Sequence, residues 1–271
     1  MLIEFFDILL GIALAITGSL TFWPVTHGYD FYIPIVLFIA GYVAGFAFMF
    51  CLYWLASLFA KKYKKGEARP SKWSRFWFTN GAWFICFHAH VILSIKDKNK
   101  VPTNKRFLLV CNHRSKFDPM LTEAYFTRRK IAFITKQDNL KIPLARAFMP
   151  GMCYMGIDRD DKLQSLEVMK KSIALISNNE ASVGVYPEGK RNYGVDVGEF
   201  HEGVFNIAIH AKCPIVVMTI QGTENISKRY PRFTKVKMII EGVLPYESFE
   251  GQTAKAVSDM VHGIMKERLS K

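Results

Sequence analysis

The sequence predicts an α/β protein with a mainly parallel central sheet flanked by helices and an N-terminal membrane helical hairpin. Two long apolar stretches open the chain, and a basic cluster follows them. From about residue 101, short apolar runs alternate with segments of helical periodicity. We therefore expect a membrane hairpin over residues 1–60, a basic linker and interfacial aromatic helix over 61–98, and an α/β domain over 99–271.

The two apolar stretches cover residues 2–23 and 31–60. The second contains no charged residue, and the first contains only Glu4 and Asp7. At about 1.5 Å per helical residue, each can cross a hydrocarbon core of roughly 30 Å. Small residues recur at helical spacing and allow close helix packing: Gly11 with Ala15, and Gly41 with Gly45. A shallow re-entrant hairpin is the alternative arrangement.

Charge is distributed unevenly along the chain. Residues 1–60 carry a net charge of −3, whereas the remaining 211 carry +16. Segment 61–75 holds seven basic residues and one acid. By the positive-inside rule this flank faces the cytoplasm, which predicts an integral protein of the cell membrane with its α/β domain on the cytoplasmic face. Nucleic acid is not an expected partner, because the aromatic residues cluster near the membrane segment and no nucleic-acid-binding signature is present.

Segment 73–95 is rich in Trp and Phe, and its large aromatic residues fall on one side of a helix. Smaller and more polar residues fall on another side. We expect a helix in or near the membrane interface, where aromatic residues anchor well. A third span is the alternative, but it would carry the following domain away from the basic flank. His88 and His90 lie in this segment without a third ligand nearby, so we expect no metal site there.

The spacing of apolar residues predicts the strands and helices of the α/β domain. Predicted strands are the short apolar runs 107–111, 131–135, 183–186, 215–220 and 236–240. Predicted helices are 120–127, 163–177, 204–211 and 254–269. The five cysteines are widely spaced and form no CxxC pair, so we expect buried, reduced thiols.

The stretch "LLVCNHRSKFDP" carries a candidate catalytic pair. His113 follows an apolar run, and Asp118 comes five residues later, before Pro119. Residues five apart do not share a helix face, so both belong near the turn after the strand, where open α/β sheets bind ligands. There the carboxylate can accept the Nδ1 proton and leave Nε2 as a base. In the competing interpretation Asp118 is only an N-cap with proline at N1, and His113 only ends a strand.

A covalent nucleophile has weaker support in the same stretch. Ser115 lacks the G-x-S-x-G pattern of a nucleophile elbow. Cys111 ends an apolar strand and is expected in the core. The sequence therefore favours general-base chemistry over an acyl-enzyme.

A second candidate group is "VYPEGKRNYG", a basic turn after a predicted strand. Backbone N–H groups near Gly189 can face an oxyanion, and Arg191 can grip a phosphate in forked geometry. Glu188 is placed to orient that arginine. A solvated basic turn is the competing interpretation.

The stretch "YMGIDRDD" offers a third candidate, Arg159, among acidic residues. An ordinary helix start competes with a binding role here, with Asp160 or Asp161 as the cap.

Taken together in this order, four blocks resemble the glycerolipid acyltransferases, and most closely the 1-acyl-sn-glycerol-3-phosphate (lysophosphatidate) acyltransferase family. The resemblance covers about residues 107–223, and its first and third blocks are the specific ones. The blocks are Asn112-His113-x-x-x-x-Asp118, Gly156-Ile157-Asp158-Arg159, Tyr186-Pro187-Glu188-Gly189-x-Arg191 and Cys213-Pro214-Ile215-Val216.

This resemblance implies transfer of an acyl chain from an acyl thioester to the sn-2 hydroxyl of lysophosphatidate, giving phosphatidate. The co-substrate is acyl-CoA or an acylated acyl carrier protein, the acceptor is a lysophospholipid, and no cofactor or metal is implied. By position, His113 is the general base and Asp118 orients it. The acceptor and its phosphate are assigned to Lys136, Arg159, Glu188, Gly189 and Arg191.

The chain departs from the family pattern at two positions. Lys190 stands where the third block usually has threonine, which adds a charge and removes a hydroxyl near the acceptor headgroup. Val217 stands where the fourth block usually has a second proline. The alternative functions are a sister acyltransferase acting on another lysophospholipid or on glycerol 3-phosphate, and a non-catalytic protein that binds anionic lipid.

Overall fold

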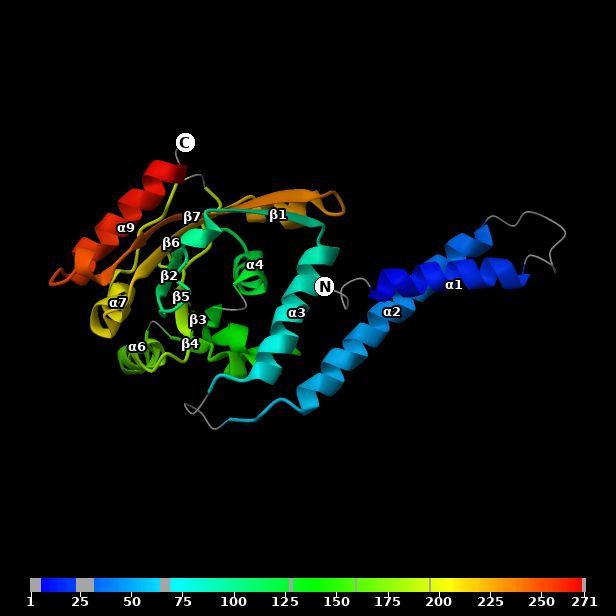
Figure 1. Cartoon of the computed structure of the whole chain (residues 1–271), viewed down its shortest axis with the longest axis horizontal. Coiled ribbons are helices and arrows are strands. Elements are labelled where there is room, and N and C mark those ends of the chain that lie inside the picture. Colours follow the sequence, from blue (N-terminus) through cyan, green and yellow to red (C-terminus); the bar gives the residue numbers. More distant parts are fainter. Residues whose placement is uncertain are drawn as a thin grey trace. The chain divides into compact units, whose positions relative to one another are not determined.

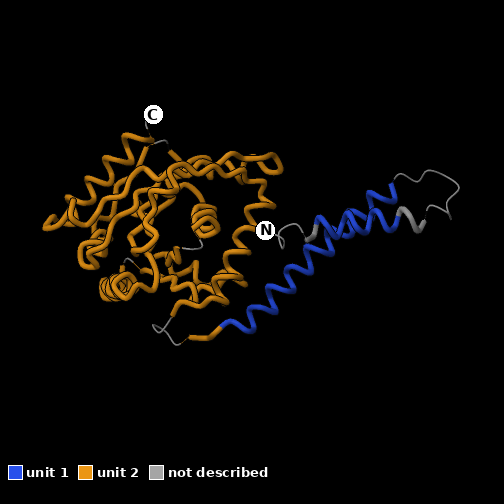
Figure 2. Tube along the Cα trace, in the orientation of Figure 1, with its two compact units in different colours: residues 1–60 blue, residues 61–271 orange. Residues whose placement is uncertain are grey.

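The computed structural model describes residues 6–22, 32–63, 69–126, 129–158, 160–194 and 196–269. The chain forms two compact units, Met1–Ala60 and Lys61–Lys271 (Figure 2). The second unit holds the sheet and all the candidate site residues.

The first unit consists of helices α1 (Phe6–Phe22) and α2 (Tyr32–Leu58). Among the described residues, α2 is the one helix long and apolar enough to cross a membrane. Helix α1 has 17 residues, so two complete spans remain a prediction and the re-entrant arrangement remains its alternative. The predicted close packing is present: a Cβ on Gly41 would lie 2.7 Å from the Gly11 Cα.

The second unit is built on a sheet with seven strands in the described part of the chain, in the order β1-β7-β6-β2-β5-β3-β4. Strands β6 and β7 are antiparallel, and every other neighbouring pair is parallel. The prediction of a mainly parallel sheet is confirmed. The strands are β1 (Val91–Lys96), β2 (Leu108–Cys111), β3 (Ile131–Lys136), β4 (Met155–Ile157), β5 (Ser182–Val185), β6 (Ile215–Gln221) and β7 (Thr234–Leu244).

Helices cover both faces of this sheet (Figure 1). Helices α6 (Lys162–Ser177), α7 (Asn206–Ala211) and α9 (Ala254–Leu269) pack on one face. Helices α3 (Lys72–His88) and α4 (Phe117–Tyr125) pack on the other, with the short helix α5 (Ala145–Phe148). All four residues of β2 are buried, as a continuous apolar run in a sheet covered on both sides requires.

The segment predicted as one aromatic helix over 73–95 is a helix followed by a strand. Helix α3 ends at His88, and His90 takes a left-handed backbone conformation with φ 55°. Strand β1 then joins the edge of the sheet beside β7. Its side chains alternate between half-buried and exposed, so the period is two and the expectation of helix beyond His88 is wrong.

The smaller and more polar side of α3 packs inward. Arg75 on α3 makes a buried ion pair with Glu123 on α4, with Nη1 and Oε1 2.9 Å apart. Burial raises the pKa of Glu123 to about 7, and the arginine partly opposes that shift. This pair joins α3 to the helix that carries Asp118, while Trp73 and Phe76 remain exposed on the outer side of α3.

Candidate active site

The candidate residues gather at one edge of the sheet. Strands β2, β5, β3 and β4 are parallel neighbours, so their carboxyl ends meet there. His113 follows β2, Glu188 follows β5 and Lys136 ends β3. Arg159 comes shortly after β4 but lies outside the described residues, so its placement stays a prediction. Open α/β sheets bind their ligands at this edge.

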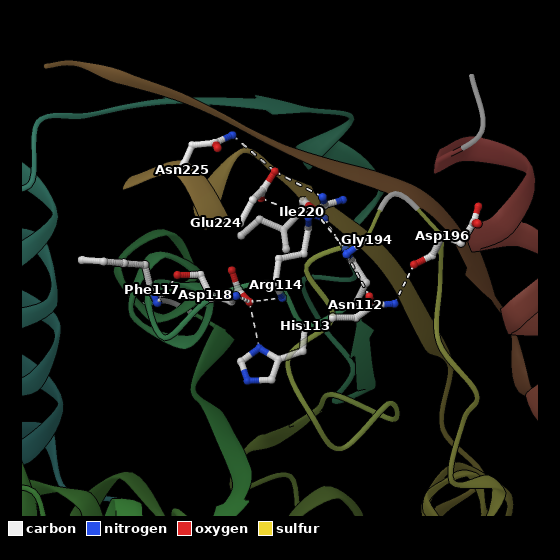
Figure 3. A network of polar contacts seen from close by, with 12 residues as sticks. Asn112, His113, Arg114, Phe117, Asp118, Gly194, Asp196, Ile220, Glu224 and Asn225 are labelled. Atoms are coloured by element: carbon white, nitrogen blue, oxygen red, sulfur yellow. Dashed lines mark hydrogen bonds and ion pairs between the residues drawn. The ribbon is translucent and has the colours of Figure 1, made fainter. Parts of the chain in front are cut away.

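His113 and Asp118 are in direct contact. Nδ1 of His113 lies 2.8 Å from Oδ2 of Asp118, and the other ring nitrogen points away from the carboxylate (Figure 3). Asp118 is fully buried, whereas the His113 side chain is 20% exposed. A buried carboxylate that accepts the Nδ1 proton leaves Nε2 with a lone pair directed outward. The geometry is that of an oriented general base.

Asp118 also organises the loop that carries the histidine. Its Oδ2 accepts the backbone N–H groups of Arg114 and Ser115, each at 2.7 Å. Helix α4 begins at Phe117, so Asp118 is its second residue and not its N-cap. The interpretation of Asp118 as only an N-cap is therefore wrong, because its carboxylate reaches back to the loop instead.

An aromatic stack supports the imidazole ring. The Tyr186 ring lies 4.5 Å from the His113 ring, centroid to centroid, at an interplanar angle of 30°. Tyr186 in turn stacks on Phe133 at 5.6 Å and 9°. Burial raises the pKa of Tyr186 well above its usual value, so the phenol stays neutral. The stack restricts the rotation of His113.

Glu188 binds the backbone around the histidine. Its Oε1 accepts the His113 N–H at 2.9 Å, and its Oε2 accepts the Gly198 N–H at 3.0 Å. The Asn192 N–H donates to the His113 carbonyl at 2.7 Å. Both Glu188 oxygens bind backbone amides, and no ion pair joins Glu188 to Arg191 in the described part of the chain, so the expectation that Glu188 orients Arg191 is not confirmed. The loop after β5 therefore holds the His113 residue from both of its peptide groups.

The basic turn after β5 presents two cations to solvent. Gly189 has φ 65°, and its N–H donates to the Tyr186 carbonyl at 3.0 Å, so this N–H is not available to an oxyanion. Lys190 and Arg191 are exposed and make no ion pair among the residues the structure describes. Both line a depression of about 480 Å³, together with Glu188 and Asn192.

Lys136 and the start of α6 complete this edge. Lys136 is exposed and pairs with Asp138 at 2.9 Å, and this contact lowers the pKa of Asp138. Asp161 is the N-cap of α6 and accepts the Gln164 N–H at 3.0 Å, as the helix-start interpretation expects. Lys136 therefore lies at the same edge of the sheet as His113, and its ammonium group is paired with Asp138.

Sequence reasoning missed two contacts that tie the His113 loop to β6. The Asn112 side chain donates to the Ile220 carbonyl at 3.0 Å and accepts the Ile220 N–H at 2.8 Å. Arg114 forms a forked ion pair with Glu224 at 3.0 and 3.2 Å. Each pair spans more than 100 residues, so no local signal reveals the partner.

The cysteines take no part in the site. All five are free, four are buried and Cys51 is exposed, which corrects the expectation of burial for that one. Burial raises the pKa of Cys111 well above its usual value, so this thiol stays protonated and unreactive. Within the described ranges, no group of three or more His, Cys, Asp or Glu residues is placed to hold a metal ion.

Comparison with known proteins finds a similarity to acyltransferases. The family model described as Acyltransferase matches residues 92–221, from β1 to the end of β6 and including every loop of the site. The 1-acyl-sn-glycerol-3-phosphate acyltransferase of Haemophilus influenzae is 24% identical over 66% of this chain and 76% of that protein. The chain is similar to the 1-acyl-sn-glycerol-3-phosphate acyltransferases over these residues. The enzyme of the same name from Saccharomyces cerevisiae is 25% identical over 60% of this chain and 56% of the yeast protein.

A solved structure shares the fold. The crystal structure of the 1-acyl-sn-glycerophosphate (LPA) acyltransferase PlsC from Thermotoga maritima matches with a TM-score of 0.63 and 19% identity. The match covers 82% of this chain and 88% of the Thermotoga maritima chain. At this identity the likeness concerns the fold. The alignment with the yeast relative covers less than two thirds of that protein, so the substrates are argued separately from the site.

Proposed function

We propose that this acyltransferase transfers an acyl chain from a thioester to the sn-2 hydroxyl of lysophosphatidate, giving phosphatidate. The observation that carries the proposal is the 2.8 Å contact between His113 and the buried Asp118, at the edge where open α/β sheets bind their ligands. The relatives named for this reaction support the same assignment. A protein that only binds lipid has no need of such an oriented base.

In the proposed reaction, Nε2 of His113 removes the proton of the sn-2 hydroxyl as its oxygen attacks the thioester carbonyl carbon. The carbonyl oxygen becomes an oxyanion while Asp118 stabilises the imidazolium. The intermediate collapses, the carbon–sulfur bond breaks, and the thiolate takes the proton from His113. No acyl-enzyme forms, and the products are the diacyl lipid and a free thiol on coenzyme A or on the carrier protein.

Arg191 is the proposed ligand for the acceptor phosphate. Its guanidinium group is exposed, lines the depression beside Glu188 and makes no ion pair in the described part of the chain. A planar guanidinium suits a phosphate better than a point charge does. Lys190 adds a second cation at the same rim. Lys136 would have to leave Asp138 to contribute, and Arg159 completes the proposed set.

The site is proposed to work at a membrane on the cytoplasmic side. Helix α2 has 27 residues, which is long enough to cross a bilayer, and its most apolar 18-residue window has a mean hydropathy of 2.4. The basic segment that begins at Lys61 follows it directly. A membrane-resident acceptor can then reach the site while its acyl tail remains in lipid.

A direct assay tests the base. Purified protein in detergent receives acyl-CoA and lysophosphatidate, and both thiol release and diacyl product are followed. We expect His113→Ala to lower kcat by on the order of 10²–10⁴-fold. Equal rates for wild type and His113→Ala would rule out the proposed base.

A second assay tests the phosphate ligand. Arg191→Ala should raise the KM for lysophosphatidate and leave the KM for an uncharged monoacyl lipid unchanged. Lys170→Ala, on the exposed side of α6, is the matched control. An equal change with both acceptors would show that Arg191 does not bind the phosphate.

A further inference from the structure

An exposed aromatic and basic loop enters strand β7. We call residues 228–233, together with His90, the aromatic–basic tip. Tyr230 and Phe233 are 61% and 62% exposed, so two neighbouring aromatic rings face solvent here. The His90 ring lies 5.7 Å from the Tyr230 ring and 5.0 Å from the Phe233 ring, and its Nδ1 contacts the Pro231 carbonyl. The two rings are therefore supported in an exposed position.

The charge around the tip has one sign. Residues 226–240 contain five basic side chains and no acidic one. All five are exposed, and none makes an ion pair among the residues the structure describes. These cations are Lys228, Arg229, Arg232, Lys235 and Lys237.

The basic surface continues onto the solvent-exposed side of strands β1 and β7, at the edge of the sheet. Lys235 of β7 lies opposite Ile92 of β1, and Lys237 lies opposite Ser94. All four side chains are exposed, whereas the alternate residues of both strands pack toward α3 and α4. The tip and this sheet face form one surface of cations with apolar groups among them.

The tip projects from the same edge of the sheet as His113. Strand β7 runs antiparallel to β6, so its start lies beside the carboxyl end of β6, and β2 is parallel to β6. The pairing with β6 begins at Gln221 and Lys237. The three residues of β7 before Lys237 therefore extend about 10 Å beyond the end of β6. Figure 1 shows β1 and the start of β7 beside the last turn of α3.

We propose that the aromatic–basic tip docks on an anionic lipid surface. Tyr230 and Phe233 enter the headgroup region, where amphipathic aromatic rings are favoured. The five cations meet lipid phosphates, an attraction that scales with the number of basic residues near the surface. Docking turns the edge that carries His113 toward the bilayer. The inference rests on the proposed function in one respect: the orientation helps the reaction only if the acceptor is a lipid in the membrane.

A fluorescence experiment locates the tip. In full-length protein carrying Cys51→Ser, Ser227→Cys places a fluorophore beside the tip without altering it. Asn178→Cys, at the end of α6 and so at the opposite edge of the sheet, is the matched control. The protein is placed in nanodiscs of phosphatidylcholine, with or without one third phosphatidylglycerol, that contain headgroup-proximal nitroxide lipid.

We expect quenching at position 227 in the anionic discs, severalfold weaker quenching in the neutral discs, and none at position 178. Absence of quenching at 227, or equal quenching at 227 and 178, overturns the proposal. So does a response at 227 to an oligonucleotide or to an acyl carrier protein that anionic discs do not produce.

Substitutions then separate the tip from the reaction. Arg229→Gln with Arg232→Gln should weaken tip binding by roughly 10- to 30-fold, and Tyr230→Ser with Phe233→Ser should abolish shallow insertion. Lys170→Gln with Lys171→Gln, both exposed on α6, changes the same charge away from this edge and should have no effect. Quenching at 227 unaltered in both tip variants overturns the proposal.

Activity distinguishes the two proposals from each other. The tip variants should lose rate severalfold with lysophosphatidate in anionic vesicles and keep the wild-type rate in detergent micelles. If the proposed function fails while docking is correct, wild type shows no acylation in either medium and position 227 is still quenched. Equal loss of rate in vesicles and micelles would show that the tip acts on the fold rather than on the membrane.

Discussion

The Glu188 carboxylate and the His113 backbone N–H form a hydrogen bond of 2.9 Å, although 75 residues separate them. The second carboxylate oxygen accepts the Gly198 N–H at 3.0 Å. Glu188 is 4% exposed, so both bonds lie away from solvent. A side chain from the loop after β5 therefore sets the position of the residue that follows β2, and Glu188 acts as a positioning residue for the proposed base.

Glu188→Gln should lower kcat by roughly 10-fold, with the KM values of both substrates little changed. Glutamine keeps one acceptor oxygen but turns its NH₂ group toward the other backbone donor. Such an unsatisfied contact costs about 1–3 kcal/mol when buried, so the Tm should fall as well. Steady-state kinetics and thermal unfolding on the same preparation measure both effects.

Glu199→Gln is the matched control for this change, since Glu199 lines the same depression and is exposed. It should leave kcat and Tm unchanged. A raised KM for lysophosphatidate with intact kcat in Glu188→Gln would show that Glu188 contacts the acceptor instead of positioning His113.

Asp118→Asn should lower kcat by on the order of 10²–10³-fold while the Tm falls by less than in Asp118→Ala. Oδ2 accepts three hydrogen bonds, whereas Oδ1 makes none among the described residues. Asparagine can therefore place its oxygen at the Oδ2 position, so that all three donors keep an acceptor. The negative charge beside the imidazolium is lost, and the asparagine NH₂ group takes the buried Oδ1 position. Product formation and thermal unfolding measure the two quantities.

Asp118→Ala completes that comparison because it removes the acceptor of all three donors. It should lower both activity and Tm. If Asp118→Asn destabilises the protein as much as Asp118→Ala, the charge itself holds the loop. Wild-type activity in Asp118→Asn would exclude a catalytic role for the carboxylate.

The parts of the fold that local pattern encodes could be predicted. The apolar run that became β2 ends directly before Asn112 and His113, and strand ends of this kind place their side chains at one edge of a parallel sheet. Helix α9 has the predicted bounds, because its apolar spacing is regular. The contact of His113 with Asp118 follows from the same local reasoning.

The remaining features depend on partners distant in sequence. Nothing near Glu188 indicates that its oxygens bind the amides of His113 and Gly198. The Arg114–Glu224 pair joins loops that become neighbours only when β2 and β6 pair. Strand β1 was missed because it follows the apolar, aromatic helix α3 directly and continues its apolar composition. Its alternation extends over six residues, which is a weak signal beside that long apolar segment.

The stability of the wild type should fall as pH rises from about 4.5 to 7, through Glu123. Burial raises the pKa of this carboxyl from 4.5 to about 7, so between these values the folded chain binds more protons than the unfolded chain. The stabilisation is present below pH 4.5 and is lost by about pH 7. The contribution amounts to about 3 kcal/mol.

Glu123→Gln does not titrate and should flatten this dependence. Between pH 5 and 8, the unfolding free energy of the wild type should therefore fall by about 3 kcal/mol relative to that of Glu123→Gln. Denaturant unfolding at both pH values measures it. Glu167→Gln, on the exposed side of α6, should show no such change. Parallel pH profiles for wild type and Glu123→Gln would contradict the raised pKa.

Gly41→Val should weaken the packing of α1 against α2 and lower the Tm. A Cβ at this position would lie 2.7 Å from the Gly11 Cα, which is backbone and cannot rotate away. Overpacking of this kind costs about 1–3 kcal/mol. Ala40→Val adds the same branched side chain on the exposed side of α2 and should leave the Tm unchanged. Helical signal followed by circular dichroism during heating in detergent measures the effect, and equal melting of the two variants would show that the Gly11–Gly41 contact does not hold the helices together.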